Sequence, residues 1–245
     1  MSAPRSRKKP PKSAPRKQGG RLVDHITQEL RQLILDRKIA PGTVLIQTEW
    51  AEKLQVSRTP LREAFRILEQ DGLVQVSNGN RTVQVVSFSE QELRDLYEIR
   101  QVIDGLAARL LATKGISPKQ DAELVELLDV MESARKPFDP ATMLAADIAF
   151  FLKIAEFCGN SRVAQQASLI KMTNYSLHSY LTELDPSSES LERILEATSR
   201  QHRSIYAAIK SGDGDLAELA ASHHINATLN SGLITRAAKP SDVAG

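Results

Sequence analysis

The chain has 245 residues, of which 41% are hydrophobic and 25% are charged, a balance typical of a soluble globular protein. This length allows two domains of moderate size, each with a core of its own. No apolar run reaches the roughly 18 residues of a membrane-spanning helix, and the first residues do not resemble a signal peptide. The single cysteine excludes an internal disulfide and a multi-cysteine zinc module. We therefore expect a cytoplasmic protein without a membrane partner.

Charge is unevenly distributed, although the formal net charge is only +2. Residues 1–21 hold eight basic and no acidic side chains, and residues 22–87 hold eight of each. Residues 88–245 hold 16 basic and 22 acidic side chains, a net charge of −6. The basic segment is rich in proline, serine and glycine, which predicts disorder. Two interpretations of this tail stay open: it attracts phosphates without sequence preference, or it is only a solvated extension.

The next part of the chain has the pattern of three helices and a hairpin. Apolar residues at helical spacing begin at Leu22 and predict a first helix, which ends before Pro41-Gly42. Thr48 and Ser57 are placed to cap a second and a third helix, and Gly72 ends the third. Two β-rich runs then flank a turn sequence. Besides the first helix, the predicted elements are helices over 49–54 and 57–71 and strands over 73–76 and 82–86.

From residue 89 onward no further strand is predicted, only six long amphipathic segments separated by glycine or proline. They cover residues 90–114, 119–134, 141–157, 162–184, 191–210 and 216–236. Helices of this length favour an antiparallel bundle. The predicted fold is therefore mainly α: a winged helix-turn-helix with a small β-hairpin wing, followed by an all-α antiparallel helical bundle. The expected domains are a basic tail (1–21), the winged helix (22–87), the bundle (88–236) and a loose C-terminal tail (237–245).

The stretch from Val56 to Phe65 is the most informative part of the sequence. Three arginines recur at every fourth position and share one face of the predicted third helix: Arg58, Arg62 and Arg66. The opposite face is apolar and suited to burial. A helix with one cationic face and one apolar face is typical of DNA recognition, because arginine binds guanine through two hydrogen bonds. Thr59 is placed to contact a phosphate or a base edge.

The alternative interpretation is that this charged face is only solvated. Arg66 has candidate partners one turn away on the same helix, namely Glu63, Glu69 and Gln70. We therefore predict DNA contacts for Arg58 and Arg62, and an intrahelical partner for Arg66.

Residues 22–87 resemble the winged helix-turn-helix of the GntR family of bacterial regulators. The matched positions are Pro41-Gly42, Leu45, Ser57 to Ala64, Asp71 to Val74 and the wing glycine, Gly79. The resemblance implies that the third helix enters the major groove and that the wing lies by the minor groove. This wing is a residue or two longer than the usual short form. The full set of predicted DNA-binding residues is Thr48, Ser57, Arg58, Thr59, Arg62, Gly79, Asn80 and Arg81.

One recognition helix reads only a few base pairs, so useful specificity requires two half-sites on a two-fold axis. We therefore expect a homodimer on a near-palindromic operator. Together with the family resemblance, this indicates a transcription regulator that acts as a repressor.

Few side chains in the helical part have the chemistry of a ligand. Asp147 lies on a helix that is otherwise lined by apolar residues, where an unpaired carboxylate is costly. His202 and His224 lie on the last two predicted helices, which are adjacent and antiparallel. Two imidazoles and one carboxylate from neighbouring helices form a known metal-ligand set.

Residues 90–235 resemble the FCD ligand-binding domain of the FadR subfamily, in its six-helix VanR-like form. The resemblance implies a metal held by an aspartate, a histidine four residues later, and a histidine on each of the last two helices. Asp147, His202 and His224 match this pattern, whereas Phe151 stands in place of the second ligand. Two interpretations stay open: a three-ligand site for Zn²⁺ or another divalent metal, or a metal-free pocket in which both histidines hydrogen-bond the effector.

Arg100 matches an arginine of the family's first sensing helix, and a guanidinium is suited to binding a carboxylate. The resemblance thus implies a small organic acid as the effector. The alternative for Arg100 is an intrahelical ion pair with Asp104, worth about 0.2–0.5 kcal/mol on a helix surface. The predicted effector-binding residues are Arg100, Asp147, Asn174, His202 and His224.

Two other functions compete with that of a ligand-responsive regulator. A metal-dependent enzyme would use the same aspartate and two histidines as a facial triad, but no general base or nucleophile stands out beside them. A DNA-packaging protein would bind without sequence preference and without a small-molecule response. Neither alternative uses both the arginine face and the bundle, so we predict a regulator and no enzyme.

Overall fold

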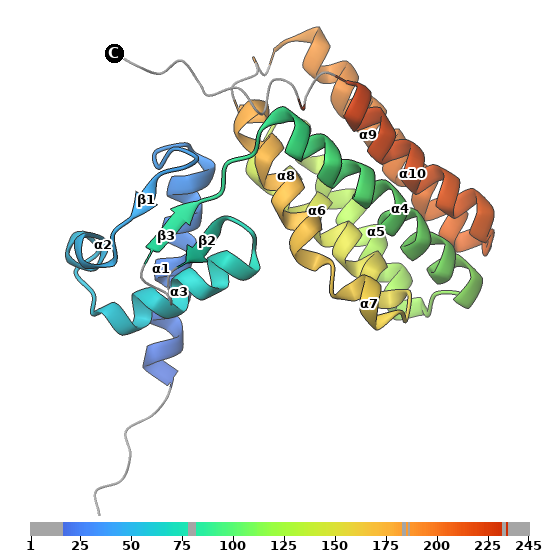
Figure 1. The fold of residues 1–245 in the computed structure, drawn as a ribbon. Helices are drawn as coiled ribbons and strands as arrows, with labels where there is room; N and C mark the ends of the chain where they lie inside the picture. Colours follow the sequence, from blue (N-terminus) through green and yellow to red (C-terminus); the bar gives the residue numbers. More distant parts are fainter. Residues whose placement is uncertain (1–16, 78–81, 183–184, 186, 232–233, 235–245) are drawn as a thin grey trace, which may run out of the picture.

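The computed structural model describes residues 17–77, 82–182, 185, 187–231 and 234. Figure 1 shows a smaller part that contains a sheet and a larger bundle of long helices, which confirms the predicted mainly helical fold. The smaller part comprises α1 (Lys17–Leu35), β1 (Val44–Leu45), α2 (Gln47–Lys53), α3 (Arg58–Gln70), β2 (Val74–Ser77) and β3 (Thr82–Val85). The larger part comprises α4 (Glu90–Lys114), α5 (Pro118–Ser133), α6 (Pro140–Phe157), α7 (Ser161–Ala164), α8 (Ala167–Thr182), α9 (Glu189–Ser211) and α10 (Gly214–Asn230). None of the helices in the described residues is long and apolar enough to span a bilayer.

The winged helix is built on one apolar core between α1, α3 and an antiparallel sheet of order β1-β3-β2. In β3, Val83 and Val85 are buried while Gln84 between them is half-buried, as expected for a strand with one face on the core. The buried side chains of α3 lie on a single face of the helix: Leu61, Ala64, Phe65 and Leu68. This packing fixes which side of α3 points to solvent.

The starts of the helices in this part differ from the prediction. Helix α1 begins at Lys17, five residues earlier than predicted. Helix α2 begins at Gln47, so Ile46 occupies its N-cap and Thr48 lies inside its first turn. Ser57 does occupy the N-cap of α3, but its side chain makes no capping hydrogen bond. The two predicted side-chain caps are therefore wrong.

The differences at α2 and α3 have physical causes. Pro60 is the third residue of α3 and has no N–H group to donate to the Ser57 hydroxyl. Strand β1 ends one residue before Ile46 and carries the chain directly into α2. This strand was not predicted, because two residues are too few to show an alternating pattern.

The bundle helices are separated by strong local signals. Helices α4 and α5 both begin with a capping box, made by Ser89 with Glu92 and by Ser117 with Gln120. Gly212 ends α9 in the left-handed conformation, at φ 76°. The helix predicted over 162–184 is instead divided into α7 and α8. Its apolar spacing continues across the break, and no glycine or proline marks the division.

Helix α8 also contacts the winged helix. Asp71, which follows α3, accepts hydrogen bonds from Arg31 of α1 and from Lys171 of α8. The neighbouring Gly72 has φ 73°, and a Cβ added there would lie only 1.9 Å from Cγ of Met172. A glycine therefore suits both the turn and the close approach of α8.

Candidate functional site

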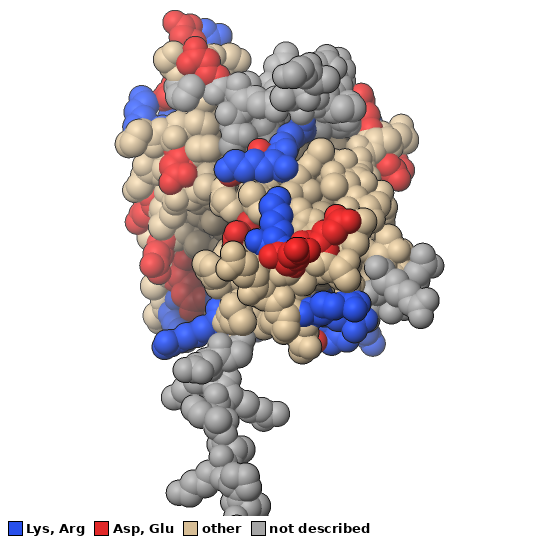
Figure 2. All heavy atoms as spheres, turned by 90° about the vertical axis from the view of Figure 1, so that its left-hand side faces the viewer, with Lys and Arg blue, Asp and Glu red and all other residues tan. Residues whose placement is uncertain are grey.

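The outward face of α3 presents arginines to solvent. Arg58 and Arg62 are exposed, and neither makes an ion pair with another of the described residues. Arg66 instead pairs with Glu63 at 2.9 Å, which confirms the predicted intrahelical partner. Figure 2 views the winged helix from its outer side and shows basic side chains in separate groups interspersed with acidic ones. This side of the molecule therefore carries separate basic groups rather than one broad positive patch.

The other predicted DNA-binding residues are placed as follows. Ser57 and Thr59 are exposed at the start of α3, beside Arg58. Thr48 is exposed on α2. The wing residues Gly79, Asn80 and Arg81 lie outside the described residues.

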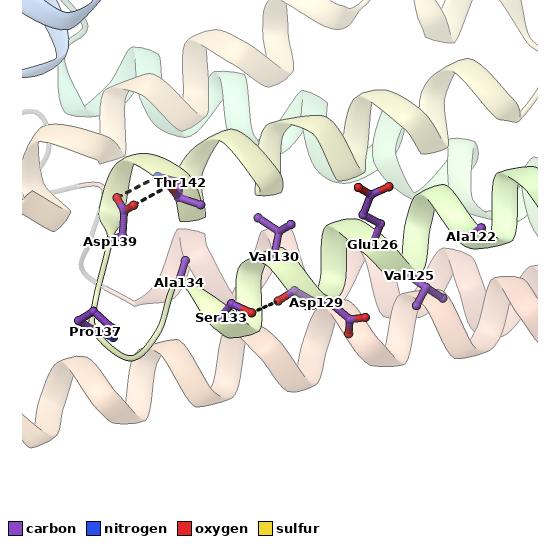
Figure 3. Close-up of a pocket in the computed structure, with 10 residues that line it drawn as sticks. All are labelled: Ala122, Val125, Glu126, Asp129, Val130, Ser133, Ala134, Pro137, Asp139 and Thr142. Atoms are coloured by element: carbon purple, nitrogen blue, oxygen red, sulfur yellow. Dashed lines mark hydrogen bonds between the residues drawn. The ribbon is translucent and has the colours of Figure 1, made fainter.

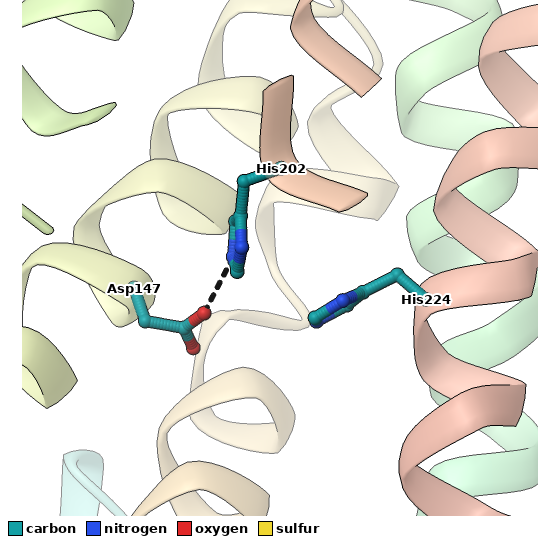
Figure 4. Close-up of side chains that lie close together, drawn as sticks. All are labelled: Asp147, His202 and His224. Atoms are coloured by element: carbon teal, nitrogen blue, oxygen red, sulfur yellow. Dashed lines mark hydrogen bonds and ion pairs between the residues drawn. The ribbon is translucent and has the colours of Figure 1, made fainter. Parts of the chain in front are cut away.

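The predicted carboxylate and both imidazoles meet inside the bundle. Asp147 comes from α6, His202 from α9 and His224 from α10, and one ligand atom of each lies within 4.8 Å of the others. Figure 4 shows the two rings and the carboxylate converging from three helices. His202 and His224 are buried, with 1% and 7% of their surface exposed. The bundle thus forms a compact set of one oxygen and two nitrogen donors.

His202 has a hydrogen-bond partner at each ring nitrogen. Its Nδ1 lies 2.8 Å from the carbonyl oxygen of Thr198, and its Nε2 lies 2.7 Å from Oδ1 of Asp147. The carbonyl oxygen of Thr198 only accepts, so Nδ1 donates to it, and Nε2 shares one hydrogen bond with the Asp147 carboxylate. A metal ion between Nε2 and the carboxylate would replace the proton on that nitrogen.

His224 has the complementary arrangement. Its Nδ1 lies 2.9 Å from Oε1 of Gln201, which leaves Nε2 as the nitrogen available to the cluster. Burial and the nearby His202 lower the pKa of His224 to about 3, so this ring is neutral near pH 7. A second hydrogen bond that orients a neutral imidazole is the usual support of a metal-binding histidine. Gln201 was not identified from the sequence, because no periodic pattern distinguishes it.

Asp147 remains ionised despite its position. Burial alone would raise its pKa, but the hydrogen bond from His202 and the nearby positive charges lower the pKa below the ordinary value. Nδ2 of Asn174 donates to the second carboxylate oxygen at 2.7 Å. The predicted effector residue Asn174 therefore lies in direct contact with the cluster.

Arg100 takes the alternative arrangement considered from the sequence, the ion pair with Asp104. Its Nε and Nη2 donate to Oδ2 of Asp104 at 3.0 and 2.7 Å, and only 1% of its surface is exposed. Nη1 donates to Thr173 and to Asn174 at 2.9 and 3.0 Å. The guanidinium thus serves a buried network, and direct binding of an effector carboxylate by Arg100 stays a prediction.

Phe151, which stands where the family pattern has a histidine, lies against both histidines of the cluster. Its ring stacks on His224 at a centroid distance of 5.3 Å and lies 5.6 Å from His202. The guanidinium of Arg100 lies 5.2 Å from the same ring. An apolar ring here removes one donor from the set and excludes water from that side of the cluster.

Asp147 and His224 of the cluster line a cavity of about 100 Å³. Its other polar lining residues are Tyr97, Arg100, Asn174 and two threonines. The remaining lining residues are apolar: Met131, Phe138, Pro140, Met143, Leu144, Leu177, Ile194, Leu195 and Ile225. A largely apolar cavity with a few polar groups fits a small molecule with an apolar body and a single polar group.

A second hollow of about 680 Å³ lies over α5 and the start of α6, and Figure 3 shows its lining. Its polar side chains bond locally: Ser133 donates to the carbonyl oxygen of Asp129, and Asp139 caps α6. No polar groups converge on a common point in this hollow, so we assign it no ligand.

Comparison with known proteins gives two family matches. Residues 22–83 match "Bacterial regulatory proteins, gntR family", and residues 95–227 match "FCD domain". A relative in Paenarthrobacter nicotinovorans, a "Probable D-xylose utilization operon transcriptional repressor", is 30% identical over 208 residues, 84% of each chain. The "Gluconate operon transcriptional repressor" of Bacillus licheniformis is 27% identical, over 77% of this chain and 75% of that one. The solved structure of "E. coli McbR/YncC" has the same fold, with a TM-score of 0.69 at 21% identity over 88% of this chain and 98% of its own.

Proposed function

Because the chain belongs to the GntR family of transcription regulators and carries an FCD domain, we propose that it is a repressor released from its operator by a small carboxylic acid with an apolar body. The observation that carries DNA binding is the outward face of α3, where Arg58 and Arg62 are exposed without an ion-pair partner among the described residues. Relatives named as operon repressors support the sign of regulation. No step of this function requires enzymatic turnover.

The cavity supports the proposed class of effector. Drug-sized ligands occupy pockets of about 300–1,000 Å³, so a cavity of about 100 Å³ suits a smaller metabolite. Its apolar wall offers few partners to hydroxyl groups, and burying an unpartnered hydroxyl is unfavourable. A sugar acid therefore fits less well than an aliphatic or aromatic acid of similar length. The polar lining residues would receive the carboxylate.

The donor set fits a divalent cation such as Zn²⁺. Asp147 and the two Nε2 atoms of His202 and His224 would hold it, with Thr198 and Gln201 orienting the rings. When bound, the cation would supply an open coordination position for an oxygen of the effector. Asp104 neutralises Arg100, so a divalent cation beside Asp147 would leave this network with one excess positive charge, which favours a monoanionic acid.

Helix α8 supports a route from the effector to the DNA-binding part. Asn174 and Leu177 of this helix line the cavity, while Lys171 contacts Asp71 and Tyr175 packs against the winged-helix core. A shift of α8 that accommodates the effector would therefore act on the end of α3. Helix α4, which carries Tyr97 and Arg100, provides a second route through the segment after the wing. The effector can change operator affinity only if it binds the state with shifted α8 more tightly than the state that binds the operator.

Two acids with six carbons test the effector class. Hexanoate is expected to raise the melting temperature of the purified protein and to release it from its operator, because its chain is apolar. Gluconate, which carries a hydroxyl group on each of the other five carbons, is the matched control and is expected to do neither. The reverse result would contradict the apolar cavity as the effector site. Selection of duplexes from a randomised pool supplies the operator, and recovery of no common near-palindrome would contradict specific DNA binding.

A reporter strain tests the sign of regulation. Deletion of the regulator is expected to raise expression from a promoter that overlaps the selected operator. A fall in expression would identify an activator and contradict the proposed repression.

A further inference from the structure

The winged helix lacks the surplus of positive charge that attracts a polyanion. Residues 22–87 hold eight basic and eight acidic side chains. Three of the basic side chains are paired with carboxylates: Arg31 with Asp71, Lys38 with Asp36 and Arg66 with Glu63. Residues 88–245 have a net charge of −6. Non-specific affinity for DNA comes from cations that neutralise phosphates, so these two parts of the chain supply little of it.

The positive charge of the chain is concentrated ahead of the winged helix. Residues 1–21, which we call the basic segment, carry eight basic and no acidic side chains. Residues 1–16 of this segment lie outside the described residues. Its end belongs to the described start of α1, where Arg21 is exposed and makes no ion pair with another described residue. A block of like basic charges at a chain end is typical of a segment that binds nucleic acid.

Helix α1 places the end of the basic segment beside the proposed DNA-binding helix. Ile26 of α1 shares one apolar core with Leu61 and Phe65 of α3, so the two helices pack against each other. Residues 20–25 of α1 are exposed or half-buried. Figure 1 shows these first turns extending beyond α3 on the side away from the sheet. The basic segment therefore joins the winged helix next to α3 and not next to the acidic bundle.

We propose that the basic segment binds phosphates of the duplex beside the bases that α3 contacts, and that it supplies a sequence-independent part of the affinity for DNA. This inference rests on the proposed function, because it takes α3 as the helix that faces the duplex. Residues 1–16 can span at most about 55 Å, and duplex DNA carries one negative charge per roughly 1.7 Å. Several phosphates outside the half-site are therefore within reach of the lysines and arginines of the segment.

Salt dependence tests this contact, because each neutralised phosphate contributes about 0.9 to the slope of log affinity against log salt concentration. The segment variant carries Arg7→Gln, Lys8→Gln and Lys9→Gln. It should lower the slope by up to about 3 for each bound chain, which reduces the loss of affinity between about 50 and 200 mM salt by up to roughly 40-fold. Fluorescence anisotropy with a labelled operator duplex measures the slope, and an unchanged slope would overturn the proposal.

A matched control separates a local contact from an effect of net charge. The α9 variant carries Arg193→Gln, Arg200→Gln and Arg203→Gln and loses the same charge. These arginines are exposed on α9, which Figure 1 shows on the side of the bundle away from the winged helix. Because exposed charges are screened beyond about 10 Å at 0.1 M salt, the α9 variant should keep the wild-type slope. Equal changes in the two variants would overturn the contact.

The length of the duplex locates the contact. Adding about ten base pairs to each end of a duplex that ends at the half-sites should raise wild-type affinity by about 10-fold or more in low salt, and the segment variant should gain less. A chain with the order of residues 2–16 scrambled keeps every charge and should gain as much as wild type. A smaller gain in the scrambled chain would contradict a sequence-independent contact. Tighter DNA binding by the segment variant would mean that the segment covers the acidic bundle instead, and would overturn the proposal.

Base preference separates this inference from the proposed function. The segment variant should keep the wild-type ratio of affinities for the operator and for a duplex of shuffled sequence, because phosphate contacts carry no sequence information. A segment variant that loses this preference would contradict the proposed contact and leave the regulator function supported. A wild-type protein without any preference, whose slope still falls in the segment variant, would contradict the regulator function and support the phosphate contact.

Discussion

Helix α3 and the polar centre of the bundle hold charged side chains in opposite environments. Arg58 and Arg62 are exposed and make no ion pair within the described chain. Arg100 is buried with four hydrogen bonds to Asp104, Thr173 and Asn174. Water solvates Arg58 and Arg62 at little cost, whereas a buried charge is tolerated only with its partners in place. The proposed DNA-binding face therefore consists of independent side chains, and the proposed effector site consists of mutually dependent ones.

This difference has a consequence for regulation. An exposed arginine can be removed without changing its neighbours, but each member of the buried chain Asp104, Arg100, Asn174, Asp147 and His202 determines the hydrogen bonds of the next. A ligand that engages one member disturbs the rest of the network. The hydrogen-bonded network in the bundle is thus suited to detecting a small molecule. The independent arginines of α3 are suited to binding DNA.

The largest effect is expected for operator binding, when the exposed arginines of α3 are removed. Arg58→Ala with Arg62→Ala should lower operator binding by about 2–6 kcal/mol, because each bidentate contact to guanine contributes roughly 1–3 kcal/mol. The melting temperature should not change, since neither side chain has a partner to lose among the described residues. Fluorescence anisotropy with a labelled operator measures the affinity, and Arg66→Ala, which removes the residue paired with Glu63, is the control. A folded double variant that still selects the operator tightly would contradict the assignment of α3.

The next largest effect is expected on metal binding at the Asp147, His202 and His224 cluster. Phe151→His restores an imidazole four residues after Asp147, at a position whose ring already touches both histidines. It should raise the affinity for Zn²⁺ by about 10–100-fold, and His202→Ala should abolish binding, because one donor is gained or lost. Competition with a chromophoric chelator measures both changes. Equal zinc content in wild type, Phe151→His and His202→Ala would show that the cluster is a metal-free part of the pocket.

The same contrast explains which residues of the site could be predicted from the sequence alone. The arginine face of α3 follows from a spacing of four residues on one helix, so its exposure was predictable. The meeting of Asp147, His202 and His224 was also anticipated, with the family resemblance naming the histidines to compare. Gln201 and Thr173 were not, because a hydrogen bond between residues on separate helices leaves no periodic signal. Arg100 had two candidate arrangements in the sequence, and only the packing of α8 against α4 decides between them.

The fold was predictable to a similar depth. Long helices ended by glycine, proline or a capping box were located closely, because those signals are local. The break between α7 and α8 and the short strand β1 were missed, because no glycine or proline marks the break and two residues are too few to show an alternating pattern. The Ser57 cap failed for a local reason, because Pro60 removes the N–H group that the hydroxyl would bind.

A smaller effect is expected at the junction of the two regions. Asp71→Asn removes the carboxylate that joins Arg31 of α1 to Lys171 of α8, while keeping the size of the side chain. The variant should bind its operator but respond less to the effector, with the ratio of affinities measured without and with effector reduced several-fold. Glu69→Gln, also close to the end of α3 but exposed, is the control. An unchanged ratio in Asp71→Asn would exclude this junction as the route of coupling and favour the one through α4.

The smallest effect is expected on the free energy of unfolding, at a carboxylate of the bundle whose partners are its neighbours in the sequence. Asp139 caps α6, and the Thr142 hydroxyl together with backbone N–H groups lowers its pKa below the ordinary 3.8. Asp139→Ala should reduce the free energy of unfolding by about 1 kcal/mol near pH 7, and Asp139→Asn, which keeps an acceptor oxygen but not the charge, should reduce it by less. Because the folded pKa is depressed, the part of this stabilisation that comes from the charge is complete above pH 3.8 and is lost as the pH falls through the folded value. Urea unfolding of both variants should therefore show smaller deficits below the folded pKa of Asp139 than at pH 7. Deficits that are unchanged in acid would mean that Asp139 does not stabilise α6 through its charge.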